Sequence, residues 1–180
     1  MRAPTTQETL EKLLAERILI LDGAMGTMIQ RHRLSEDDFR GEILHDHPHE
    51  LKGNLDVLSL TRPEIIEDIH RSFFDAGADV VETNTFSANA VSQADYRLED
   101  RIRELNLASA RIAVKVAREY TRRDPERPRF VAGSMGPMNK TLSMSRDVDR
   151  PHHRDVSFDQ VKAAYAEQVR GLVDGGVDLL

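Results

Sequence analysis

The sequence predicts an α/β protein in which short parallel strands alternate with helices. Three short apolar runs, at 18–21, 80–81 and 130–132, predict strands, and each ends at a short polar or glycine-containing segment. Apolar residues at helical spacing fill the intervals between these runs. Because strands that alternate with helices in this way form parallel sheets, the expected order is β-α-β-α-β-α.

The chain is expected to begin with a helix that leads into the first strand. Thr5 and Glu8 have the spacing of a capping box, and leucines follow at helical spacing. The run at 18–21 holds four consecutive apolar residues, which is typical of a strand buried on both faces of a parallel sheet. Residues 31–60 are polar and irregular, and we expect a loop around the histidines at 45–49.

Three later helices are predicted from their caps and apolar spacing. A capping-box pattern formed by Thr61 and Glu64 predicts a helix that ends at Gly77. Apolar spacing predicts a long helix over about 99–122. A further capping-box pattern at 157–160 predicts a last helix that ends at two glycines.

One short pattern occurs twice, as DAGADVV at 75–81 and as DGGVDLL at 174–180. The first copy is interpreted as a helix end, a tight turn and the start of a strand. The second copy should be the same structure, so residues 179–180 would begin a fourth strand. A chain end inside a buried strand leaves backbone groups unpaired. The sequence therefore predicts that residues 1–180 are a truncated part of a domain.

Composition excludes several classes of protein. The 180 residues carry 25 Lys and Arg against 31 Asp and Glu, a net charge of −6, which argues against a nucleic-acid partner. The longest apolar run is far shorter than the roughly 18 residues of a membrane helix. The absence of cysteine excludes disulfides and thiolate metal sites within the chain. We expect a cytoplasmic protein with no membrane partner.

Candidate functional residues stand at the carboxyl ends of the strands, where ligands bind in parallel α/β folds. Asp22 and Glu82 are suited to receive an ammonium group, and backbone N–H groups of the glycine turns are suited to hold a carboxylate. Together they suit a small zwitterion such as an amino acid. The alternative is structural, because such residues also cap turns or pair with basic side chains.

A histidine trio at 45–49 is the strongest candidate for a metal site elsewhere in the chain. Its members are His45, His47 and His49. Alternate residues in a flexible, proline-containing stretch do not form a preformed site, so a solvated loop is the better interpretation. The sequence therefore assigns neither a metal ligand nor a catalytic residue.

Four segments carry a recognisable pattern: ILDGAMGTMIQ at 20–30, LKGNLD at 51–56, ADVVETNTF at 78–86 and VAGSMGP at 131–137. In this order they resemble the homocysteine S-methyltransferase family, and specifically the homocysteine-binding domain of cobalamin-dependent methionine synthases. The resemblance covers nearly all of residues 7–180. The LKGN sequence at 51–54, with Arg40 and Gly41 before it, favours the cobalamin-dependent type.

The resemblance implies a (β/α)8 TIM barrel whose carboxyl-end face binds homocysteine. Residues 1–180 would supply the first three βα units and the start of the fourth strand, a partial homocysteine-binding domain. In the family, zinc held by three cysteines binds the homocysteine sulfur, which takes a methyl group from methylcobalamin that methyltetrahydrofolate recharges. The substrate-binding residues implied here are Asp22, Gly23, Ala24, Met25, Gly26, Thr27, Glu82, Asn84, Thr85 and Ser134.

The chain departs from the family pattern in two ways. It lacks the zinc-binding cysteines, so zinc and cobalamin would be bound only by the full-length enzyme, and this chain alone would be inactive. Ala24 stands where the family often has glycine, a change that is tolerated if φ is negative at that position. Two alternatives stay open: a corrinoid-independent homocysteine methyltransferase using betaine or S-methylmethionine, and a non-catalytic half-barrel that pairs with itself or with a partner.

Overall fold

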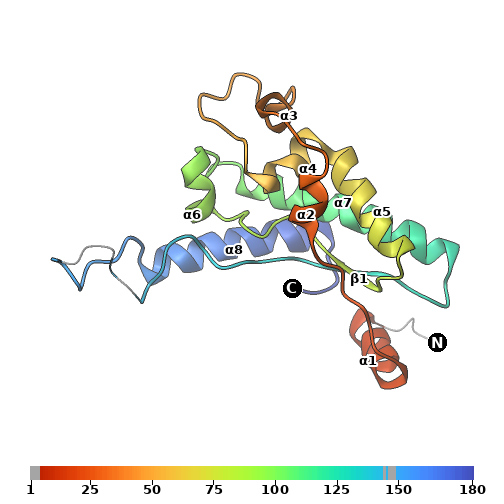
Figure 1. Cartoon of the computed structure of the whole chain (residues 1–180). Helices are drawn as coiled ribbons and strands as arrows, with labels where there is room; N and C mark the ends of the chain where they lie inside the picture. The colour runs from red at the N-terminus through yellow and green to blue at the C-terminus, as the bar shows by residue number, and fades with distance from the viewer. Residues whose placement is uncertain (1–4, 144, 146–148) are drawn as a thin grey trace.

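The computed structural model describes residues 5–143, 145 and 149–180, and Figure 1 shows its course. Helices make up most of its regular structure. None of the helices in these ranges is long and apolar enough to cross a membrane. The elements are α1 (Thr6–Glu16), α2 (Met25–Gln30), α3 (Glu36–Arg40), the 3-10 turn η1 (Leu55–Val57), α4 (Leu58–Thr61), α5 (Pro63–Asp75), β1 (Val80–Glu82), α6 (Ala90–Gln93), the 3-10 turn η2 (Ala94–Tyr96), α7 (Ile102–Arg123), β2 (Phe130–Ala132) and α8 (Phe158–Gly175).

The described residues contain one small parallel sheet. β1 and β2 pair in parallel, with Val81 opposite Val131. One isolated parallel bridge joins Leu21 to β1, and another joins Leu179 to β2. The four segments therefore lie side by side in the order of the sequence. This arrangement confirms the predicted α/β class and its parallel sheet.

The first apolar run is not the buried strand that its composition predicts. Ile18 is 86% exposed, and Leu21 is 51% exposed. Residues 18–20 form no regular strand, and Leu21 makes only the bridge to β1. Among the described residues, no further strand pairs with the outer edge of this segment.

Helices α5, α7 and α8 pack as neighbours beside the sheet, with α7 between the other two (Figure 1). The approach of α8 to α7 is close because two positions on α8 lack a side chain. A Cβ atom on Gly171 would lie 2.7 Å from Cβ of Asn106, and one on Gly175 would lie 2.3 Å from Cβ of Ala110. Neither glycine can gain a methyl group unless the two helices separate.

Two of the three predicted capping boxes are confirmed. Thr5 accepts a hydrogen bond from the N–H of Glu8 at the start of α1, and Ser157 caps α8 in the same way. The box predicted at Thr61 is wrong. Thr61 ends α4, and its hydroxyl donates to the carbonyl of Val57 at 3.4 Å. Because Thr61 already lies in a helical turn, it does not take the extended conformation of an N-cap.

Residues 31–60 contain more regular structure than their polar, irregular sequence suggests, although 45–49 form the expected loop. Ser35 opens α3 with a capping box to Asp38. Scattered apolar residues of this region enter the main core beside Ile66 and Ile69 of α5: Phe39, Leu44, Leu51, Val57 and Leu58. Their irregular spacing explains why neither helical nor strand periodicity revealed them.

The histidine turn at 45–49 is held by Arg40. Its guanidinium donates to the backbone carbonyl of His47 and, at 3.0 Å, to that of His49. The ring Nε2 of His47 lies 2.8 Å from the carbonyl oxygen of Tyr96. The turn is therefore an ordered part of the fold.

The repeated pattern is a repeated structure. The backbone N–H of Asp79 donates to the carbonyl of Ile20, and the Asp79 carboxylate accepts from the N–H of Ile20 at 3.0 Å. The N–H and carboxylate of Asp178 make the same two bonds to Val131, the second at 2.9 Å. The turn glycines that precede the two aspartates also match, with φ of 104° and 88°. Each aspartate joins the start of its own segment to the preceding one.

Asp79 is fully buried at the amino end of β1 and is surrounded by cations. Arg17 donates to both of its oxygens at 2.8 and 3.0 Å, and Arg127 donates at 3.2 Å. Arg129 forms a third ion pair at 3.5 Å. Burial acts to raise the pKa of Asp79, but the hydrogen bonds outweigh it and lower the pKa to about 2. This cluster joins the segment after α1 to β1 and β2.

His70 of α5 makes the stability of the fold sensitive to acid. Its two ring nitrogens are buried and have no hydrogen-bond partner among the described residues. Burial lowers its pKa from 6.5 to about 4. Between these values the unfolded chain binds a proton that the folded chain does not, so the contribution of His70 to stability falls as pH falls.

We expect a His70→Leu variant to lose less stability than the natural chain between pH 7.5 and pH 4.5. The expected difference is about 2 to 3 kcal/mol in the free energy of unfolding. Urea unfolding of both proteins at the two pH values measures it. Equal losses in the two proteins would contradict the assignment, because groups common to both cancel in the comparison.

Candidate functional site

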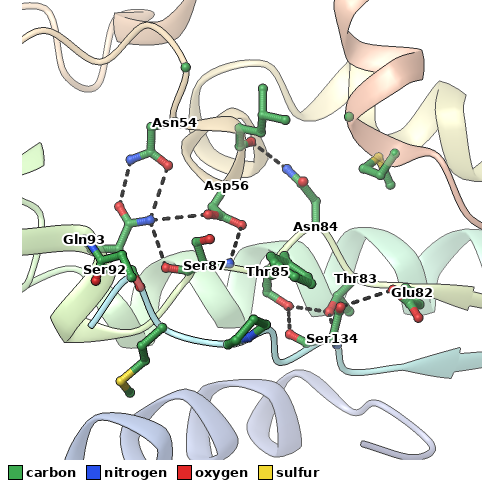
Figure 2. Close-up of a pocket in the computed structure, with 18 of the residues that line it drawn as sticks. Asn54, Asp56, Glu82, Thr83, Asn84, Thr85, Ser87, Ser92, Gln93 and Ser134 are labelled. Carbon is green, nitrogen blue, oxygen red and sulfur yellow. Dashed lines mark hydrogen bonds between the residues drawn. The ribbon is translucent and has the colours of Figure 1, made fainter. Parts of the chain in front are cut away.

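The carboxyl ends of the parallel segments surround one cavity of about 670 Å³, which we call the strand-end cavity. Residues after Leu21, after β1 and after β2 form one side of it. The turn at 53–56 and the segment at 92–96 form the other side, and residues 137–139 close part of the rim. Figure 2 shows the side chains that line it.

The structure brings nine of the ten predicted site residues to this cavity. They are Asp22, Gly23, Ala24, Met25, Gly26, Glu82, Asn84, Thr85 and Ser134. Thr27 does not line the cavity and lies exposed on α2. Thr27 is the third residue of α2, which begins at Met25, and its side chain lies outside the cavity.

Asp22 and Glu82 form an acidic end of the cavity. Oδ1 of Asp22 accepts a hydrogen bond from the backbone N–H of Glu82 at 2.8 Å, and Oε2 of Glu82 accepts one from the Ser134 hydroxyl at 3.1 Å. Burial raises the pKa of Asp22 to about 7, and the charge of Glu82 adds to the increase. For the described residues, no cationic side chain pairs with either carboxylate. This end of the cavity is therefore suited to a ligand cation.

Two threonine hydroxyls fasten the end of β1 to the end of β2. The Thr85 hydroxyl donates to the carbonyl of Ser134 at 2.7 Å, and the Thr83 hydroxyl accepts from the N–H of Ser134 at 2.9 Å. The two hydroxyl oxygens lie 2.6 Å apart, so Thr83 donates to Thr85. Thr85 is fully buried, and its hydroxyl proton is used within the protein.

Asn84 joins the strand ends to the other side of the cavity. Its Nδ2 donates to the carbonyl of Leu55 at 2.7 Å. This bond holds η1 against the residues that follow β1, as Figure 2 shows. The Asn84 side chain thus links the two sides of the cavity.

Sequence reasoning did not assign the polar cluster on the far side of the cavity. Its members are Asn54, Asp56, Ser87 and Gln93. Asn54 and Gln93 exchange amide hydrogen bonds of 2.7 and 3.2 Å, although they are far apart in sequence. The segment at 51–56 was part of the family resemblance, which is the signal that pointed to two of the four.

Ala24 adopts a backbone conformation that alanine disfavours. Its φ is 54°, in the left-handed region, so the negative φ that would suit alanine there is not adopted. The chain turns at Ala24 from the strand-end segment into α2, where Ala24 is the N-cap residue. A non-glycine residue in this region costs about 1 to 2 kcal/mol.

We expect Ala24→Gly to raise the free energy of unfolding by about 0.5 to 1 kcal/mol, because relief of this strain exceeds the added freedom of the unfolded chain. The matched control is Ala163→Gly, in an exposed helical position of α8, which should lower it by about 1 kcal/mol. Chemical denaturation measures both. A destabilised Ala24→Gly variant would contradict the backbone assignment.

The residues that the structure describes do not provide a zinc site. The chain contains no cysteine, and no group of three or more His, Asp or Glu side chains in the described ranges is placed to hold a metal ion. The ligand set of three cysteines that the resemblance implies has no counterpart here.

The sequence and the fold are similar to those of known homocysteine methyltransferases. The family model described as homocysteine S-methyltransferase matches residues 19–180. Crystal structures of the homocysteine methyltransferase MmuM from Escherichia coli, in oxidized and metallated forms, each have a TM-score of 0.68 and 25% identity. Each match covers 94% of this chain and 55% of that chain. The chain thus spans about half the length of these structures.

Proposed function

This chain belongs to the homocysteine S-methyltransferase family, and we propose that it forms the homocysteine-binding part of an enzyme that methylates homocysteine to methionine. The observation that carries the proposal is the strand-end cavity, which gathers Asp22 and Glu82 with the adjacent backbone turns. A cavity at the carboxyl ends of parallel strands is the usual ligand site of such folds.

The acidic end of the cavity fits the ammonium group of an amino acid. Asp22 and Glu82 lie close enough for the charge of Glu82 to add to the raised pKa of Asp22. A bound ammonium group would offset this repulsion and favour the ionised form of Asp22. The role of this chain in methyl transfer is then positioning, because it fixes one end of the amino acid while the sulfur is directed to the methyl donor.

We propose that the fold is part of a (β/α)8 barrel. The parallel segments lie in sequence order, as barrel strands do, and the helices between them pack beside the sheet. The likeness to MmuM over 55% of that chain supports the same proposal. The described residues would then form the first three βα units and the start of a fourth strand.

Two versions of the proposal differ in the methyl donor that the enzyme uses. The segment at 51–56, with Arg40 and Gly41, favours a methionine synthase that uses methylcobalamin and methyltetrahydrofolate, bound by domains outside these residues. The alternative is a corrinoid-independent enzyme, supported by the likeness to MmuM. The coding sequence that follows residue 180 distinguishes them, since only the first type continues into folate-binding and cobalamin-binding domains.

Zinc would be bound by cysteines that lie outside this chain. The metallated MmuM structure supports a metal in the family. Zinc bound to a thiol lowers the thiol pKa and so provides thiolate near neutral pH. Because these ligands are absent here, we expect the 180-residue chain to form no methionine by itself.

Calorimetric titration of the 180-residue chain with homocysteine, under reducing conditions, tests the proposal. We expect saturable binding, and binding at least about tenfold weaker for 4-mercaptobutanoate, which lacks the ammonium group. Absence of binding, or equal binding of the two compounds, would contradict the proposed site. Binding that requires zinc would contradict the placement of the zinc ligands outside the chain.

A further inference from the structure

Gln168 of α8 is a fully buried amide that contacts the strand ends without lining the strand-end cavity. Its Nε2 donates to the carbonyl of Thr85 at 2.7 Å and lies 3.5 Å from the carbonyl oxygen of Ser134. Its Oε1 has no hydrogen-bond partner among the described residues. The side chain therefore acts as a donor to the segments that follow β1 and β2.

A short chain of hydrogen bonds joins Gln168 to the carboxylate of Glu82. Thr85, whose carbonyl accepts from Gln168, donates through its own hydroxyl to the carbonyl of Ser134 at 2.7 Å. The Ser134 hydroxyl in turn donates to Oε2 of Glu82 at 3.1 Å. Figure 2 shows the three strand-end residues of this chain. Two residues thus separate the buried amide of α8 from the acidic end of the cavity.

The same face of α8 holds the turn that follows β2. The Tyr165 hydroxyl donates to the carbonyl of Gly136 at 2.9 Å. Tyr165 and Gln168 are three residues apart in α8, so they lie on one face of the helix. Ser134 and Gly136 belong to the same turn, and α8 therefore fixes that turn at two carbonyls.

The Thr85 carbonyl does not need Gln168 as its only donor. It also accepts the N–H of Ala88 at 3.1 Å within its own turn. Buried carbonyls are normally paired in folded proteins, and this one would stay paired without the amide of residue 168. The amide adds a link between α8 and the residues that hold Glu82.

We propose that Gln168 is a positioning residue, which fixes the Glu82 carboxylate for the ammonium group of the bound amino acid. It acts through Thr85 and Ser134 and does not touch the ligand. The inference rests on the proposed function, because it takes the acidic end of the cavity as the ammonium site. A carboxylate that is fixed before the ligand arrives loses less conformational freedom on binding, so the complex is tighter.

The Gln168→Met variant tests this inference, because methionine has a similar length and volume but no N–H. Calorimetric titration measures its affinity for homocysteine and for 4-mercaptobutanoate, which lacks the ammonium group. We expect the ratio of the two affinities, at least about tenfold in the natural chain, to fall to about threefold or less. Partial unfolding lowers both apparent affinities by the same factor, so the ratio does not depend on it. An unchanged ratio would contradict the role of Gln168.

Asn106→Leu is the matched control. Asn106 is a fully buried amide of α7 that donates to the carbonyls of Ala88 and Ile102, each at 2.7 Å. Neither of these residues lines the cavity. The control should lower stability in urea, as Gln168→Met does, but leave the ratio of affinities unchanged. An equal fall of the ratio in both variants would mean that loosening of the helices is responsible, and would contradict the proposal.

A double-mutant cycle tests the route through Ser134. Ser134→Ala removes the hydroxyl that donates to Glu82. When this hydroxyl is absent, Gln168→Met should lower the ratio no further, because the route is already interrupted. Additive effects of the two substitutions would contradict a route through this hydroxyl.

NMR of the natural chain decides the question if Gln168→Met does not fold. The side-chain amide resonances of Gln168 should shift when homocysteine binds and stay in place when 4-mercaptobutanoate binds, because only homocysteine brings an ammonium group to Glu82. The side-chain amide of Asn106 is the internal control and should not move with either ligand. Gln168 resonances that shift equally with both ligands, or with neither, would contradict the inference.

The outcomes separate this inference from the proposed function. If the natural chain does not bind homocysteine, or binds both compounds equally, the proposed function fails and the inference fails with it. If homocysteine binds more tightly and the ratio is the same in Gln168→Met, only the role of Gln168 is contradicted. A ratio that falls in Gln168→Met but not in Asn106→Leu supports it.

Discussion

Replacing Asp79 by asparagine is expected to lower the free energy of unfolding by about 3 to 5 kcal/mol, the largest stability effect that we predict. Asp79 is fully buried, and it is the counter-ion of Arg17, Arg127 and Arg129. Loss of its charge leaves three cations close together. Arg129 is itself largely buried and cannot recover full hydration.

Urea denaturation at pH 7 measures this effect against a matched surface pair. Asp174 forms an ion pair with Arg103 at 2.9 Å, but both side chains are about half exposed or more. Asp174→Asn should therefore cost no more than about 1 kcal/mol. Similar losses in the two variants would mean that the buried cluster does not hold the amino end of the sheet.

Replacing Asp22 by asparagine is expected to weaken homocysteine binding by at least about thirtyfold, the largest effect on the proposed function. The amide oxygen of asparagine can still accept from the N–H of Glu82, so the local backbone should be retained. The variant loses the charge that attracts the ammonium group. Asp46→Asn, at a fully exposed carboxylate outside the cavity, is the control and should bind as the natural chain does.

The same variant should be at least as stable as the natural chain at pH 8. The folded pKa of Asp22, about 7, lies above its unfolded value of 3.8, so Asp22 favours the folded state at low pH and loses this contribution as pH rises through 7. Asparagine removes the cost of an ionised, partly buried carboxyl. A variant that binds weakly and is also unstable would instead indicate that Asp22 serves the fold.

Features with local signals could be predicted from the sequence. The cap at Ser157, the strands at 80–81 and 130–132, and the repeated aspartate turns all depend on residues within a few positions of each other. The site residues followed from the same signals. Carboxyl ends of parallel strands meet at one edge of the sheet, so locating the strands located most of the cavity.

Features that depend on distant partners could not be predicted in this way. The exposure of Ile18 depends on which residues distant in the sequence pack against it. The φ of Ala24 depends on the direction in which α2 leaves the strand end. The pairing of Asn54 with Gln93 joins segments far apart in the chain. No pattern within either segment identifies the other, so this pairing became evident only in three dimensions.

The most direct test of the central claim is an NMR titration of the Asp22 carboxyl carbon with and without saturating homocysteine, with Asp22→Asn providing the assignment. In the free chain we expect a pKa of about 7. With homocysteine bound, the ammonium group should lower this pKa towards the ordinary range of aspartate. An Asp22 pKa that stays near 7 while homocysteine is bound would contradict the claim that this carboxylate holds the amino acid.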